Sequence, residues 1–174
     1  MTSTGLNDVV DFINLSRDRH VEELKAFLAI PSISALAEHA ADLRRCADWI
    51  AGEMRRIGLH NVTLIETPGN PVVYADWLDA PDAPTILFYG HYDVQPVDPL
   101  DQWESPPFEA TIRDGEIYAR GSADDKGQVF MHFKAIEAWL NEAGTLPVNI
   151  KVFIEGEEEV GSTHLDTFVH DNDD

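Results

Sequence analysis

A histidine and an aspartate stand two residues apart, directly after a short apolar stretch. Residues 86–89 are apolar and lie between Pro84 and Gly90, a pattern typical of a short buried strand. In extended backbone, His91 and Asp93 would point to the same side. Ligands of open α/β sheets bind outside the carboxyl ends of the strands. The pair therefore suits a metal-binding imidazole and a carboxylate that orients it.

Two further stretches carry acidic residues that could complete such a site. Asp124 and Asp125 precede an expected helix, where an aspartate is also an ordinary N-cap, so the pattern alone leaves both interpretations open. Glu157, Glu158 and Glu159 follow an apolar strand. Such runs are usually solvated surface, but three adjacent carboxylates repel one another, and a nearby dication would remove that cost.

The remaining sequence predicts the elements that would position these side chains. Helices are expected at residues 7–30, with an interruption near Asp18–His20, and at 37–58, 126–142 and 162–170. Strands are expected at 61–66, 72–78, 85–90 and 148–154, with a hairpin around Asp114-Gly115. A long loop at 94–107 holds four prolines. Alternating strands and helices favour an α/β fold with a mostly parallel sheet flanked by helices.

Composition narrows the classes of function. The 174 residues fit one domain, and a formal net charge of −20 argues against binding to nucleic acid or to anionic membranes. Cys46 is the single cysteine, so no internal disulfide can form. The amino terminus lacks a signal-peptide pattern, and no apolar run approaches the ~18 residues of a membrane span. We expect a soluble, cytoplasmic protein.

Three motifs together resemble those of the co-catalytic zinc exopeptidases, which include carnosinase-type dipeptidases, carboxypeptidase G, aminoacylase and succinyl-diaminopimelate desuccinylase. The residues of these motifs are most similar to those of the dipeptidase branch. The motifs are Gly90-His91-Tyr92-Asp93-Val94-Gln95-Pro96, Gly121-Ser122-Ala123-Asp124-Asp125-Lys126-Gly127 and Glu155-Gly156-Glu157-Glu158-Glu159-Val160-Gly161-Ser162.

The resemblance implies a role for each matching residue. His91 would bind one zinc ion, Asp93 would orient its imidazole, and Asp124 would bridge two zinc ions. Glu158 would be the general base on a zinc-bridged water, and Glu159 would bind the second zinc ion. Manganese or cobalt could occupy the same ligands. The implied activity is hydrolysis of dipeptides or related amide bonds, with small peptides or N-acyl amino acids as substrates.

The family's pattern extends beyond this chain. A further acidic ligand, a further histidine and a lid domain used for dimerisation would lie after Asp174, so residues 1–174 are expected to be the N-terminal portion of the catalytic domain. We therefore expect little turnover by the chain alone, although the full-length relatives are expected to be homodimeric enzymes. One alternative is a non-catalytic or complementing fragment that binds a partner chain. Another is an acidic domain that binds calcium through residues 157–159.

Overall fold

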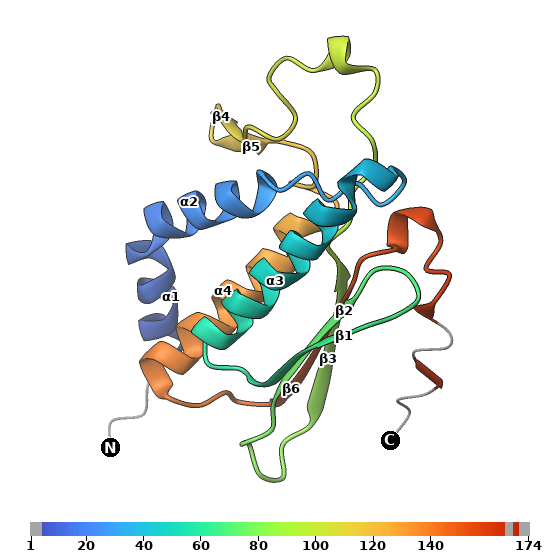
Figure 1. Ribbon diagram of the computed structural model, residues 1–174. Helices are drawn as coiled ribbons and strands as arrows, with labels where there is room; N and C mark the ends of the chain where they lie inside the picture. The colour runs from blue at the N-terminus through green and yellow to red at the C-terminus, as the bar shows by residue number, and fades with distance from the viewer. Residues whose placement is uncertain (1–4, 166–168, 171–174) are drawn as a thin grey trace.

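The computed structural model describes residues 5–165 and 169–170, and its amino-terminal half begins with two helices that meet at a sharp bend (Figure 1). Residues 7–30 form two helices, α1 (Leu6–Leu15) and α2 (Arg17–Leu28), instead of one. The predicted interruption exists but lies at Ser16, two residues before the expected position. Ser16 has φ −91° and ψ 2°, outside helical geometry, and its backbone N–H still bonds to Phe12.

The other long helices agree with the sequence pattern. A 3₁₀ turn, η1 (Ala37–His39), leads into α3 (Ala40–Arg56), and α4 spans Lys126–Ala143. Gly144 ends α4 in the left-handed conformation (φ 65°), which a residue without a Cβ adopts at little cost. The expected helix at 162–170 lies partly outside the described residues.

The central sheet is mixed, which corrects the expectation of a mostly parallel one. Its strand order is β1 (His60–Ile65), β2 (Val72–Trp77), β6 (Asn149–Glu155) and β3 (Thr85–His91). Only β3 and β6 run parallel, whereas β1 pairs antiparallel with β2, and β2 antiparallel with β6. The six-residue connection between β1 and β2 is too short for a parallel crossover, so it forces a hairpin.

Helices of the described residues lie against one face of this sheet (Figure 1). The core is formed by alternate strand residues and by the inner sides of α3 and α4; it includes Val73, Ala75, Ile150, Val152, Ile154, Ile50, Met54, Val129 and Phe133. Ile86 and Phe88 share this face, because they pair with Ile150 and Val152. The side chains of Leu87 and Tyr89 point to the opposite face, and each is at least half exposed.

The predicted long loop and hairpin project beyond the sheet (Figure 1). The loop contains a 3₁₀ turn, η2 (Leu100–Gln102), and the hairpin consists of β4 (Thr111–Arg113) and β5 (Glu116–Tyr118). Asp114 and Gly115 both have positive φ (52° and 85°), as a two-residue hairpin turn requires. No helix in the described residues is long and apolar enough to cross a membrane.

Candidate metal centre

The imidazole of His91 lies at the carboxyl end of β3, where the sequence pattern predicted it. It is 6% exposed, and its Nδ1 lies 3.1 Å from the Asp93 carbonyl oxygen and 3.3 Å from the Asp93 carboxylate. Both neighbours are acceptors, so Nδ1 carries the proton and donates to them. The other nitrogen, Nε2, can act as a ligand once it has lost its own proton.

Asp124 reaches the same histidine from the loop before α4. Its Oδ1 lies 3.1 Å from His91 Nε2, and its side chain is 74% exposed. Asp125 occupies the N-cap position of α4 without making a capping hydrogen bond. Its Oδ2 instead accepts the backbone N–H of His91 at 3.2 Å, and burial raises the pKa of Asp125. The capping interpretation is therefore wrong for the Asp125 side chain, which ties this loop to β3.

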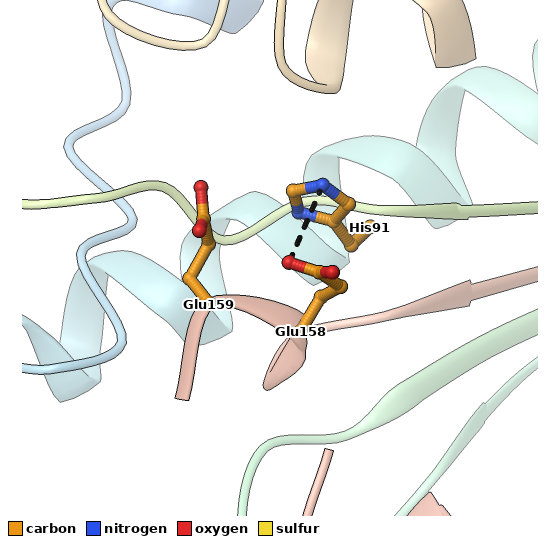
Figure 2. Close-up of side chains that lie close together, drawn as sticks. All are labelled: His91, Glu158 and Glu159. Atoms are coloured by element: carbon orange, nitrogen blue, oxygen red, sulfur yellow. Dashed lines mark ion pairs between the residues drawn. The ribbon is translucent and has the colours of Figure 1, made fainter. Parts of the chain in front are cut away.

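The three adjacent glutamates point in different directions. Glu157 faces away from His91, and its Oε2 accepts from His164 Nδ1 at 2.8 Å. Glu158 Oε2 lies 3.9 Å from His91 Nε2, and the Glu158 side chain is 45% exposed. Glu159 lies beside them, and its Oε2 accepts from Gln95 Nε2 at 2.6 Å. Figure 2 shows the carboxylate of Glu158 directed at the imidazole, with that of Glu159 next to it.

Asp93 has a second set of contacts that the sequence did not reveal. Its carboxylate is fully buried, and its oxygens accept the backbone N–H groups of Glu158 and Glu159 at 3.2 and 3.1 Å. These donors belong to the start of the 3₁₀ turn η3 (Glu158–Val160). One carboxylate thus fixes both the histidine and the acidic turn. Only the strand-end position of the glutamates could have hinted at this link.

The site is strongly acidic, and His91 responds to that charge. Burial of the imidazole opposes its protonation, but the hydrogen bond and the charge of Asp93, together with Asp125 and Asp124, raise the pKa of His91 to about 9. Carboxylates gathered around one imidazole strongly favour a positive charge at this point. A divalent cation would supply that charge and displace the proton from Nε2.

The donor atoms fit a divalent metal ion. One ligand atom from each of His91, Glu158 and Glu159 lies within 4.8 Å of the others. Two ligands of a tetrahedral zinc ion, each ~2.0–2.1 Å from it, lie about 3.3 Å apart, which is close to the 3.1 Å between His91 Nε2 and Asp124 Oδ1. Imidazole nitrogen with carboxylate oxygen is a donor set that zinc, manganese and cobalt accept.

Two neighbouring groups were missed by sequence reasoning. Gln95, in the first motif, holds the carboxylate of Glu159. Glu155 is 3% exposed, and its Oε1 accepts from Tyr89 Oη at 2.5 Å and from Ser162 Oγ at 2.9 Å, behind the site. Both are polar residues within the recognised motifs, but nothing in their spacing indicates these partners.

A second group of carboxylates, contributed by α2, α3 and α4, is already neutralised by basic side chains. Glu23, Glu53 and Glu137 bring oxygens close together, but Lys134 Nζ bonds to all three. Arg56 adds ion pairs to Glu53 and Glu137 at 2.6 and 2.8 Å. The ammonium occupies the position that a metal ion would take, so this cluster is a structural ion network.

Comparison with known proteins agrees with this geometry. The model of the peptidase family M20/M25/M40 matches residues 87–171, which include all three motifs. The human protein named Beta-Ala-His dipeptidase is 35% identical over 176 residues, covering 94% of this chain. The chain belongs to this metallopeptidase family, on its dipeptidase branch.

Two other relatives place the chain within that branch. The Cys-Gly metallodipeptidase dug1 of Schizosaccharomyces pombe is 32% identical over 175 residues, covering 95% of this chain. The crystal structure of human carnosine dipeptidase 1 superposes with a TM-score of 0.89 at 36% identity over 94% of this chain. The α/β fold expected from the sequence is thus confirmed. The chain spans only 35–37% of the length of these three proteins.

Proposed function

We propose that this chain supplies metal-binding and general-base residues of a metal-dependent hydrolase that cleaves dipeptides or related amide bonds. One observation carries the proposal. The side chains of His91, Asp124 and Glu158 come from three separate segments of the chain and meet at one point, with Nε2 of the histidine left available. The names of the relatives, which are dipeptidases, support the choice of small peptides as substrates.

We assign the metal ligands as His91, Asp124 and Glu159, with Asp124 shared between two zinc ions. When bound, the two zinc ions would lower the pKa of a water molecule and polarise the scissile carbonyl. The Asp93 carboxylate lies 3.3 Å from Nδ1 of His91, and by accepting a hydrogen bond from Nδ1–H it would keep Nε2 directed at a bound metal ion. Residues that orient ligands in this way typically change metal affinity or activity by ~10–100-fold.

Glu158 is the general base in this proposal. Its half-exposed carboxylate lies next to the ligands, 3.9 Å from Nε2 of His91, so it can reach both water and substrate. It would take a proton from the attacking water as the water oxygen bonds to the amide carbon. It would then pass this proton to the leaving nitrogen as the carbon–nitrogen bond breaks, giving a carboxylic acid and a free amine.

The test requires a complete site. The purified chain would be mixed with zinc and with a polypeptide corresponding to the remaining two-thirds of a relative, and hydrolysis of Cys-Gly and β-Ala-His would be followed by release of free amino acid. Activity should appear with wild type and with Glu157→Gln, whose carboxylate faces away, and fall by ~10²-fold or more with Glu158→Gln. Equal loss in both variants would contradict the assigned role of Glu158.

The surface of β3 favours a second function, in which this chain binds another polypeptide without catalysing a reaction itself. β3 is the terminal strand in the order of the described sheet, and Ile86, Leu87 and Tyr89 are 42%, 60% and 50% exposed. An apolar edge strand readily accepts a further strand. We take the occupant to be a chain carrying the remaining part of the catalytic domain. The high negative charge disfavours a second copy.

This second function has its own test. Co-expression with the complementary polypeptide should give a one-to-one complex on size-exclusion chromatography, and Leu87→Lys should weaken it while Leu100→Lys, at the exposed loop, should not. A stable monomer that ignores the complementary polypeptide would contradict it. Zinc as the bound metal and a cytoplasmic location both remain predictions.

A further inference from the structure

Lys126 is a fully buried lysine next to the candidate metal centre that has no role in the proposed chemistry. Its side chain is 0% exposed, and burial lowers its pKa. The ammonium group donates to the backbone carbonyls of Phe27 at 3.3 Å and Ile30 at 2.7 Å, and it lies 5.1 Å from the centre of the Phe27 ring. The Phe27 carbonyl lies in the last turn of α2 and the Ile30 carbonyl just after it, and each also accepts one backbone N–H, from Ile30 at 3.3 Å and from Ser32 at 2.9 Å respectively.

The same segment also holds the end of β3. Ser32 is fully buried, and its Oγ donates to the carbonyl oxygen of Tyr92 at 2.6 Å. Its own carbonyl accepts the backbone N–H of Val94 at 2.9 Å, and Ile33 forms a parallel β-bridge with Val94. Residues 27–33 therefore bond to the loop of Asp124 on one side, and on the other to the residues that flank Asp93.

We propose that Lys126 is a positioning residue that acts through residues 27–33. Asp124 stands two residues before Lys126, and Asp93 stands between the two residues that Ser32 holds. Residues 27–33 thus set the separation between the loop of Asp124 and the strand end of His91. This inference rests on the proposed metal site, since the separation matters for metal binding only if the two side chains share a metal ion.

The chemistry of lysine suits this task better than that of an apolar residue. A buried charge is costly unless polar groups surround it, and here the carbonyls of Phe27 and Ile30 at the end of α2 provide them. Removing the ammonium would take a charged donor from the carbonyls of Phe27 and Ile30 and leave them only their bonds to backbone N–H groups, so the segment would shift or admit water. The change would then reach Val94 through Ser32, although Val94 is distant from Lys126 in sequence.

Hydrogen exchange followed by NMR on the metal-free chain tests the coupling directly. The Val94 amide is the informative reporter, because its acceptor is Ser32 and not the loop of Asp124. In Lys126→Met, exchange of the Val94 amide should rise by ~10-fold or more, while strand β2 keeps its protection. Lys25→Met removes a lysine from the surface of α2 and should leave Val94 unchanged.

Faster exchange throughout the sheet, or only within the first turn of α4, would overturn the proposal. Should Lys126→Met fail to fold, Ser32→Ala is the milder variant. It tests the coupling from the other end and should speed hydrogen exchange of the amides of residues 121–127. A separate titration should show zinc affinity lowered by ~10–100-fold in Lys126→Met, with an altered visible spectrum of bound cobalt. A wild-type chain that binds no metal would contradict the proposed function, whereas the exchange experiment would still decide the coupling.

Discussion

The carboxylate of Asp93 accepts the backbone N–H of Glu159 at 3.1 Å, which joins the end of β3 to the start of η3. An oxygen of the same carboxylate lies 3.3 Å from Nδ1 of His91 and accepts a hydrogen bond from it. Asp93 is therefore a common anchor for two of the assigned metal ligands. The acidic turn cannot change its position without disturbing the group that orients the imidazole.

Replacement of Asp93 by asparagine should weaken metal binding strongly. Asparagine keeps one oxygen acceptor, but its NH₂ group cannot accept an N–H from η3, and it has no negative charge to favour the Nδ1 proton. Calorimetry should show zinc affinity reduced by ~10–100-fold. Asp48→Asn, on the exposed side of α3, is the control and should bind as wild type does. Unchanged affinity in Asp93→Asn would show that Asp93 does not position the metal ligands.

Gly156 should tolerate no side chain, because the chain just after β6 packs directly against the ring of Tyr92. A Cβ at this position would lie 2.3 Å from both Cζ and Oη of Tyr92, whose hydroxyl donates to Pro71. Gly156→Ala should therefore lower the free energy of unfolding by ~1–3 kcal/mol in urea denaturation. Gly52→Ala, in the interior of α3 with nothing within 4 Å, should raise it by ~0.5–1 kcal/mol. Equal effects of the two changes would contradict the packing described.

The buried ion network should make stability depend on pH in the acidic range. Burial opposes ionisation of Glu137, but hydrogen bonds from Arg56 and Lys134 outweigh it and lower its pKa to about 2. Because the pKa is lower in the folded state than in the unfolded state, Glu137 stabilises the fold above about pH 4.3, and this contribution is lost as the pH falls towards 2.

The variant Glu137→Gln tests this directly. At pH 7 it should lower the free energy of unfolding by about 3 kcal/mol, since it removes one carboxylate partner of the buried Lys134 and of Arg56. The difference from wild type should shrink as the pH falls below about 4.3, measured by urea denaturation at several pH values. Glu22→Gln removes an exposed carboxylate and should cost less than ~0.5 kcal/mol at every pH. A difference that grows on acidification would contradict a lowered pKa of Glu137 in the folded state.

Local sequence patterns predicted the positions of the helices, strands and turns well. They predicted less well how strands that are distant in sequence pair with one another. The apolar spacing of α3 and α4, and the Asp114-Gly115 turn, each depend on neighbours in sequence. The direction of β2 relative to β6 depends on residues more than seventy positions apart, which no periodicity encodes. The break lies at Ser16 and not at Asp18–His20, which belong to the first turns of α2 in the structure.

In the candidate site, too, local motifs could be recognised from the sequence, whereas contacts between distant segments could not. The order of the motifs was enough to predict that His91, Asp124 and Glu158 share one site, and their side chains lie close together in the structure. The contacts of Asp93 with the η3 backbone, and of Asp125 with the His91 backbone, involve main-chain donors that a sequence does not display. Such contacts determine how firmly the ligands are held, and they could be found only from coordinates.

The most direct test of the central claim is zinc titration by calorimetry on the 174-residue chain, beside His91→Ala and Glu159→Ala. His60→Ala is the matched control, because His60 is exposed at the start of β1. We predict binding by wild type and His60→Ala, with loss in the other two variants. Wild-type binding that survives both His91→Ala and Glu159→Ala, or no binding by wild type at all, would contradict the proposed metal centre.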